Sequence, residues 1–233
     1  MKHLLPFALL MLLLVTCRQP TVRMDSFAVH GIDVSHHQSY VDWARIAAQN
    51  IDFAFIKATE GHTFVDTLYC HNWEALQREG ILRGAYHFFR PTLDATIQAQ
   101  NFISSVLLQP GDLPPVIDAE VLDEATPAQL RTRLRVWVDS ITTHYGVAPI
   151  LYTNVNFYND HLAGHFDELP LWLARYHGDA PATTDDRAWQ FWQYGNRGRL
   201  DGVGGDIDFN VFYGSYSQLQ DLTVDVPMVL SAR

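Results

Sequence analysis

Short apolar stretches alternate with amphipathic ones along residues 28–162. The apolar stretches have the length of buried strands. The stretches between them carry apolar residues every three or four positions, as helices do. The pattern predicts strands at 28–35, 52–59, 81–89, 114–121 and 148–154, and helices at 41–50, 67–79, 92–108, 126–145 and 155–162. Gly80 and Gly146 are expected to end two of these helices.

The pattern changes after residue 162. Three further strands are expected at 170–176, 188–195 and 206–214, and the segments between them are rich in Gly, Asp, Pro and Thr and have no helical periodicity. Five strand–helix units followed by three bare strands predict an α/β protein. We expect a TIM-like eight-stranded barrel in a single domain, with its last helices missing.

The N-terminal segment MKHLLPFALLMLLLVTC (1–17) has a basic start and an apolar run that is too short to span a bilayer. It predicts a signal peptide and therefore export. Its end resembles a bacterial lipobox, although Thr16 replaces the usual Gly, Ala or Ser. The sequence thus predicts a lipoprotein anchored to a membrane through Cys17, on the periplasmic side or the cell surface. The alternative is an ordinary signal peptide and a secreted protein. Residues 18–26 are expected to be a tether, 27–216 the barrel and 217–233 a C-terminal tail.

Composition narrows the set of partners. The 233 residues are 48% hydrophobic and 18% charged, with a net charge of −10 and no Lys/Arg-rich run, which argues against nucleic acid. We expect a monomer without a cofactor. Metal binding is not predicted either, because His36 and His37 should point to opposite sides of an extended segment and have no further ligand nearby. Cys70, within the expected helix 67–79, is predicted to be a buried, inert thiol.

The segment PPVIDAEV (114–121) carries the candidate chemistry. Asp118 and Glu120 are two positions apart in a strand and share one face, where each opposes ionisation of the other. Such a pair either faces plain solvent or does acid–base work. Asp33 ends the first strand and Asp208 lies in the last, and these two strands are neighbours in a closed barrel. We therefore expect four carboxyl groups at one mouth.

Eight segments together resemble glycoside hydrolase family 25, the muramidases or lysozymes. They occur in family order between residues 31 and 214 and read GIDVSHHQSYVDW, FAFIKATEG, GAYHFFRP, PPVIDAE, PILYTN, LWLARY, WQFWQYG and DIDFNVF. The resemblance implies a flattened (β/α)5(β)3 barrel that cleaves the β-1,4 bond between N-acetylmuramic acid and N-acetylglucosamine in peptidoglycan. Ser39 stands where family members commonly have Gly.

The same resemblance implies roles for the four acids. Glu120 corresponds to the general acid and Asp118 to the carboxylate that orients or stabilises, so Glu120 should hold a proton while Asp118 is ionised. Asp33 and Asp208 correspond to the flanking acids. A route assisted by the substrate's acetamido group, an aspartate nucleophile and an inverting route all remain open.

Polar and aromatic side chains around the acids suit sugar binding. We assign substrate binding to Tyr86, Tyr152, Trp172, Tyr176 and Gln193, with Trp192 as a further aromatic candidate. For each aromatic residue the alternative is a place in the barrel core. His87 is expected to support the site from behind.

Three other functions compete with this interpretation, and one of them, an inhibitor or immunity-type partner protein, has no support in the sequence. A chitinase or endo-N-acetylglucosaminidase barrel would read D-x-x-D-x-D-x-E, but Leu113 and Val116 occupy two of those acidic positions. A non-catalytic glycan-binding barrel would have lost a central acid, and all four acids are present. All three alternatives are weaker than a muramidase.

Overall fold

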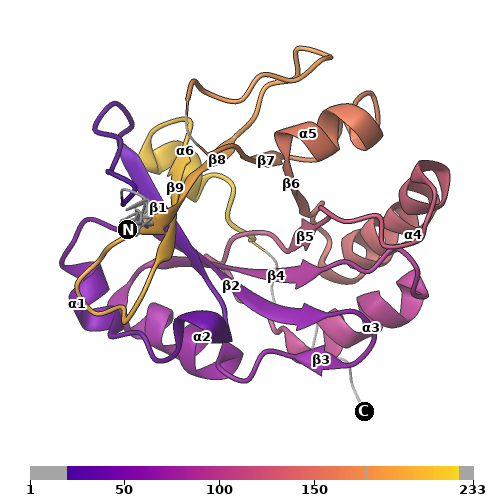
Figure 1. Ribbon diagram of the computed structural model, residues 1–233. Coiled ribbons are helices and arrows are strands. Elements are labelled where there is room, and N and C mark those ends of the chain that lie inside the picture. Colours follow the sequence, from indigo (N-terminus) through magenta and orange to yellow (C-terminus); the bar gives the residue numbers. More distant parts are fainter. Residues whose placement is uncertain (1–19, 177, 226–233) are drawn as a thin grey trace, which may run out of the picture.

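The computed structural model describes residues 20–176 and 178–225 and contains one nine-stranded sheet (Figure 1). Eight strands form a closed barrel, because the sheet order β1-β9-β8-β7-β6-β5-β4-β2 is completed by pairing of β1 with β2. The barrel strands are β1 (Val29–Val34), β2 (Phe53–Glu60), β4 (Leu82–Phe88), β5 (Val116–Asp118), β6 (Ile150–Asn154), β7 (Leu171–Ala174), β8 (Phe191–Gly198) and β9 (Ile207–Phe212).

Strand direction decides where the site forms. The strands from β1 through β2 and β4 to β8 are parallel neighbours, whereas β9 runs antiparallel to both β8 and β1. The short strand β3 (Phe64–Val65), which was not predicted, forms an antiparallel pair with β2. The expected (β/α)5(β)3 barrel is confirmed, and a reversed last strand is added to it.

Helices cover the first five strands. They are α1 (Trp43–Ala47), α2 (Tyr69–Glu79), α3 (Ala95–Ser105), α4 (Pro127–Tyr145) and α5 (Val155–Phe157), which continues into the π-turn η2 (Tyr158–Leu162). Helix α4 begins with a capping box between Thr126 and Gln129 and ends at Gly146, whose φ is 72°. No helix of the described residues is long and apolar enough to cross a membrane.

Aromatic side chains fill the barrel interior below the mouth. Phe53 and Phe55 come from β2, and the neighbouring strands carry glycine where these rings lie: a Cβ on Gly31 would sit 2.3 Å from Phe53, and one on Gly84 2.6 Å from Phe55. Phe55 also stacks on Trp172 at 4.4 Å. The interior is therefore solid, and a ligand can enter only from the end where the parallel strands finish.

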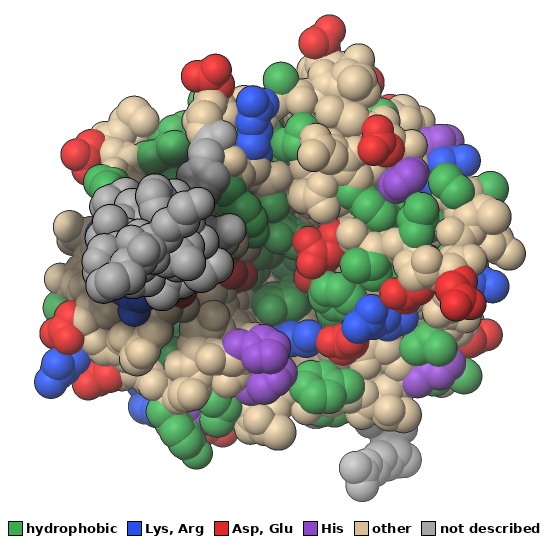
Figure 2. Space-filling view, in the orientation of Figure 1, with side chains coloured by type: hydrophobic (Ala, Val, Ile, Leu, Met, Phe, Trp, Pro, Cys, Tyr) green, Lys and Arg blue, Asp and Glu red, His purple; other side chains and the backbone are tan. Residues whose placement is uncertain are grey.

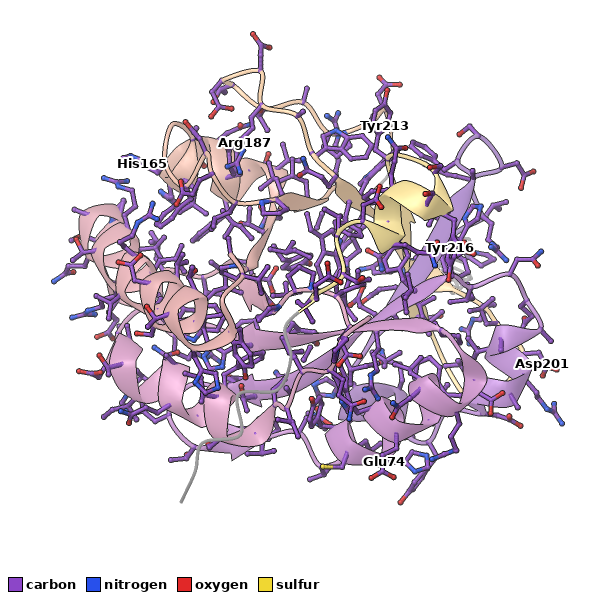
Figure 3. All side chains as sticks on the ribbon, turned by 180° about the vertical axis from the view of Figure 1, so that it is seen from behind. Glu74, His165, Arg187, Asp201, Tyr213 and Tyr216 are labelled. Atoms are coloured by element: carbon purple, nitrogen blue, oxygen red, sulfur yellow. The ribbon has the colours of Figure 1, made fainter. Side chains whose placement is uncertain are left out.

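The helix-free side of the barrel is covered by chain termini. Residues 20–26, expected to be a tether, lie against β8, where the Thr21 amide donates to the Arg197 carbonyl at 3.0 Å. Helix α6 (Tyr216–Gln220) forms where a tail was expected, and its Leu219 is buried in the barrel interior. Seen from behind, Tyr213 and Tyr216 mark the exposed edge of this region (Figure 3).

The prediction of a buried Cys70 was wrong, because its side chain is exposed. Helix α2 turns Tyr69, Asn72 and Trp73 towards the barrel, which leaves position 70 on the solvent side. The helical period was correct, but the sequence did not show which face of the helix is buried. Cys17 and the rest of the expected signal segment lie outside the described residues.

Candidate active site

A cleft of about 270 Å³ opens at the mouth where the parallel strands end. Figure 2 shows this hollow, with acidic and hydrophobic side chains inside it and histidines at its edge. All four predicted acids and all five predicted substrate-binding residues line it. The complete lining is Asp33, Ser35, His37, Lys57, Tyr86, Phe88, Asp118, Glu120, Tyr152, Trp172, Tyr176, Gln193 and Asp208.

Asp33 and Asp208 form one wall of the cleft. They are directly opposite each other in the antiparallel pair of β1 and β9, so the reversal of β9 is what brings Asp208 to the mouth. Burial raises the pKa of Asp33 to about 6, although side-chain hydrogen bonds oppose the shift. Burial and the charge of Asp33 raise the pKa of Asp208 to about 9. Asp208 therefore holds a proton at neutral pH, and its carboxyl O–H donates a hydrogen bond to Asp33.

Amide groups fix Asp33 in place. Its Oδ2 accepts hydrogen bonds from Gln193 Nε2 at 2.8 Å and from Asn210 Nδ2 at 2.7 Å. Gln193 Oε1 in turn accepts from the hydroxyl groups of Tyr152 at 2.8 Å and Tyr176 at 2.7 Å. Each residue in this series of hydrogen bonds has a hydrogen-bond partner, so the Asp33 carboxyl is held rigidly. We call these five residues the Asp33 network.

Asp118 and Glu120 form the opposite wall, and they have far fewer partners. Asp118 is the last residue of β5 and only 6% exposed, yet its Oδ1 has no hydrogen-bond partner among the described residues. Burial and then the charge of Glu120 raise the pKa of Asp118 well above its usual range. Burial and then the charge of Asp33 raise the pKa of Glu120. The pair therefore keeps a proton in conditions where ordinary carboxyl groups have lost theirs.

Burial is the first cause of the raised pKa of both Asp118 and Glu120. Adjacent charge alone predicted a protonated Glu120 beside an ionised Asp118. Burial is the larger influence and acts more strongly on Asp118, whereas Glu120 lies partly open to the cleft. Burial therefore disfavours the charged form of both carboxyl groups, and it does so most at Asp118. The positive charge of Lys57 opposes the rise in the pKa of Asp118 and of Glu120. Lys57 Nζ donates a hydrogen bond to Glu60 Oε2 at 2.6 Å.

Trp192, the further aromatic candidate, faces away from the cleft, and His87, expected to support the site from behind, does not line it either. Trp192 points out of the barrel, donates to the Arg175 carbonyl at 3.0 Å and packs near Phe27. Its neighbour Gln193 faces the cleft, and alternation along β8 therefore excludes Trp192. His87 is buried between the sheet and the helices, where its ring stacks on Trp137 at 5.6 Å.

Four lining residues were not predicted as site residues. Phe88 ends β4 and Lys57 lies within the neighbouring strand β2, so their positions next to segments that carry acids were a usable signal. Ser35 and His37 follow Asp33 directly. The two histidines do not point apart as expected, because His36–Gln38 forms a 3-10 turn (η1) in which the rings of His36 and His37 lie 4.1 Å apart. The described residues contain no cluster of three or more His, Cys, Asp or Glu side chains suited to a metal.

Comparison with known proteins identifies the group to which this barrel belongs. The family model described as glycosyl hydrolases family 25 matches residues 32–203. This chain belongs to glycosyl hydrolase family 25. It is therefore a glycoside hydrolase, and the chitinase-type alternative is set aside.

Relatives within family 25 agree with this assignment. The uncharacterised protein YegX of Escherichia coli (strain K12) is 42% identical over 200 residues, which cover 84% of this chain and 73% of YegX. Lysozyme M1 of Streptomyces globisporus is 34% identical, over 84% of this chain and 71% of that protein. A family 25 glycosyl hydrolase from Bacillus anthracis superposes with a TM-score of 0.83 and 34% identity, covering 88% of this chain and 98% of the other.

Proposed function

We propose that this family 25 enzyme is a peptidoglycan N-acetylmuramidase in which Asp118 and Glu120 carry out the reaction. The bond cleaved is the β-1,4 link between N-acetylmuramic acid and N-acetylglucosamine. The observation that carries the proposal is the raised pKa of two neighbouring carboxyl groups in an open cleft. Glycoside hydrolysis needs one protonated carboxyl for the leaving oxygen and one anion for the positively charged sugar centre.

Glu120 is the general acid in this scheme. It is the more exposed member of the pair, so a glycosidic oxygen can reach it. Asp118 lies deeper, and no residue that the structure describes forms a hydrogen bond with its Oδ1. An N–H of the substrate's acetamido group that donates to this oxygen would stabilise the Asp118 anion. The shared proton would then reside on Glu120, where it is needed. The acetamido-assisted, nucleophilic and inverting routes all use this division of labour.

The Asp33 network supplies a fixed electrostatic wall. Asp33 is held by two amide donors and faces the Glu120 side of the cleft, and its charge contributes to the raised pKa of Glu120. Tyr176 is 37% exposed and presents part of its ring to the cleft, as a sugar-binding platform requires. Tyr86, Tyr152 and Trp172 are assigned to the floor of the same binding site.

Product analysis tests the proposed bond specificity. Purified peptidoglycan is digested with the enzyme and with a Glu120→Gln variant, and the new reducing sugars are identified by mass spectrometry. We expect muramic acid at the new reducing ends with the wild type and none with the variant. Glucosamine at those ends would contradict the proposal, because the cut would then be at the other glycosidic bond.

We further propose that the protein is exported and anchored through lipid on Cys17, and that it acts as a monomer. The short apolar run that ends in Leu-Val-Thr-Cys supports the anchor. Stable attachment requires more than one acyl chain. Labelled fatty acid should enter the wild type and not a Cys17→Ala variant. Equal labelling of both would contradict the anchor and leave simple secretion.

A further inference from the structure

A strip of aromatic rings continues from the cleft onto the surface. His37 lines the cleft, its ring lies 4.1 Å from that of His36, and His36 lies 5.6 Å from Phe64 on β3. Lys57 Nζ lies 5.5 Å from the centre of the Phe64 ring and itself lines the cleft. We call His36, His37 and Phe64 the aromatic rim. It is continuous with the cleft, and the proposed reaction does not use it.

The aromatic rim is held by a dedicated buried carboxylate. Asp66 has a side chain with no exposed surface, and its Oδ2 accepts from the backbone amide of His36 at 3.0 Å and from His36 Nδ1 at 2.7 Å. The same carboxylate uses Oδ1 to accept from the Leu68 amide at 2.9 Å. One imidazole is thus fixed in orientation while a third of its side-chain surface stays exposed.

The backbone beneath the rim is also constrained. Ser35 and Gln38 form a reciprocal capping box across η1, with the Ser35 amide donating to Gln38 Oε1 at 2.9 Å. Ser39 follows with φ 56° and ψ −153°, a conformation that is almost confined to glycine and strained for any other residue. Strain of this kind persists where the surroundings hold it, and it is concentrated at functional sites.

We propose that the aromatic rim is an additional sugar-binding subsite, which takes a pyranose ring of the same glycan strand beyond the bond that is cut. The inference rests on the proposed function, because the strand in the cleft is what brings further sugars to the rim. Flat rings with exposed faces stack on the apolar faces of sugars, and imidazole nitrogens form hydrogen bonds with hydroxyl groups.

The surrounding charges favour a neutral sugar over the acidic stem peptide of peptidoglycan. Lys57 lies beside Phe64 of the rim, and its Nζ already forms an ion pair with Glu60 Oε2 at 2.6 Å. The other oxygen of that carboxylate, Glu60 Oε1, accepts a hydrogen bond from Arg90 Nη2 at 2.6 Å. The cleft itself contains four carboxyl groups. Arg90 Nη1 also pairs with Asp123 Oδ1 at 3.2 Å, so two carboxylates balance the charges of Lys57 and Arg90, and the acids of the cleft would repel an incoming anion.

Strand-length dependence tests the subsite. Kinetics are measured for wild type, His36→Ala and Phe64→Leu on soluble glycan strands of graded length, each with and without stem peptides. Loss of one stacked ring should raise KM about threefold to tenfold on long strands and leave kcat nearly unchanged. The shortest cleavable strands should show no effect, because they do not reach the rim. Phe64→Tyr keeps the ring and should behave as wild type.

Matched controls come from surface residues outside the cleft. His165→Ala and Tyr213→Leu remove an exposed histidine and an exposed aromatic residue that do not line the cleft and are labelled in Figure 3, and both should leave KM unchanged at every length. Equal effects of the rim variants on all strand lengths, no effect, or effects confined to peptide-bearing strands would each overturn the proposal. Failure of the proposed function would look different, since the wild type would then release no muramic acid ends.

Discussion

The two walls of the cleft carry the same chemistry in opposite states. On one wall, Asp33 accepts two amide hydrogen bonds and pairs with a protonated Asp208. On the other, Asp118 is equally buried but has an oxygen without a hydrogen-bond partner in the described part of the chain, and Glu120 faces the open cleft. Groups that are fully satisfied before substrate binds serve as a rigid frame. Groups that are buried and unsatisfied are ready to be completed by a ligand.

This contrast assigns stability to one wall and reactivity to the other. Removing a member of the Asp33 network should leave buried polar groups without hydrogen-bond partners and so lower the free energy of unfolding. Removing a member of the reacting pair should relieve charge repulsion and leave the fold intact, at the cost of the reaction. The predictions below separate the two walls by measuring rate and stability on the same variants.

The largest effect is expected for Glu120→Gln. A glutamine cannot protonate the leaving oxygen, so kcat should fall by about 10²–10⁴-fold. The melting temperature should stay equal to that of the wild type or rise, because a buried charge is removed. Steady-state kinetics and thermal melting on one preparation check both parts. Wild-type kcat in this variant would remove Glu120 from the reaction.

Gln193→Leu should show the opposite behaviour. It leaves Asp33 without one donor and the Tyr152 and Tyr176 hydroxyl groups without their acceptor. The free energy of unfolding should fall by at least about 2 kcal/mol, which lowers the melting temperature by about 4–8 °C. Calorimetry measures this loss. A variant as stable as the wild type would show that the Asp33 network is not a structural frame.

Tyr176 belongs to the Asp33 network and also lines the cleft. Its substitution should therefore have an effect between those of Glu120→Gln and Gln193→Leu. Tyr176→Ala should raise KM about threefold to tenfold while kcat changes less, if the ring stacks on a bound sugar. A residue of the core would instead cost about 3–5 kcal/mol of stability on truncation. Tyr176→Phe keeps the ring and loses only the bond to Gln193, so its KM should stay near that of the wild type. A large drop in melting temperature with unchanged kinetics in Tyr176→Ala would favour the core role.

The smallest effect concerns the pH dependence of stability. The pKa of Asp208 in the folded protein is raised to about 9, so its contribution to stability is present at acidic pH and is lost as the pH rises towards that value. Asparagine at position 208 does not ionise, so Asp208→Asn removes this loss of stability at higher pH. The melting temperature of the variant relative to that of the wild type should therefore rise as the pH increases from about 4 towards about 9. A constant difference across this range would contradict the raised pKa.

Periodicity and turn residues were sufficient to predict most of the fold. The Thr126–Gln129 capping box and the glycines at positions 80 and 146 set helix ends that the structure reproduces. The reversal of β9 was not predicted, since a strand of six residues has the same pattern in either direction. The packing of residues 20–26 along β8 also depends on tertiary contacts, because those residues have no periodic pattern.

The site was predicted in composition rather than in arrangement. Motif positions placed Asp33, Asp118, Glu120 and Asp208 at one mouth, and all four line the cleft. Burial differences within the Asp118–Glu120 pair could not be read from two positions in a strand. Alternation along β8 would have excluded Trp192 once Gln193 was assigned to the cleft. The position of Lys57 beside the acids depends on the register between β2 and β4, which the sequence does not specify.

The pH–rate profile of Asp118→Asn tests the central claim, that Asp118 and Glu120 share one proton and use it for catalysis. Asparagine keeps the shape of Asp118 and removes its charge, so the last proton of the pair should leave Glu120 at a lower pH. We expect kcat to fall and the basic limb of the profile, measured on soluble peptidoglycan fragments, to move towards lower pH than in the wild type. A basic limb at the wild-type position would contradict the coupling and the division of labour between the two carboxyl groups.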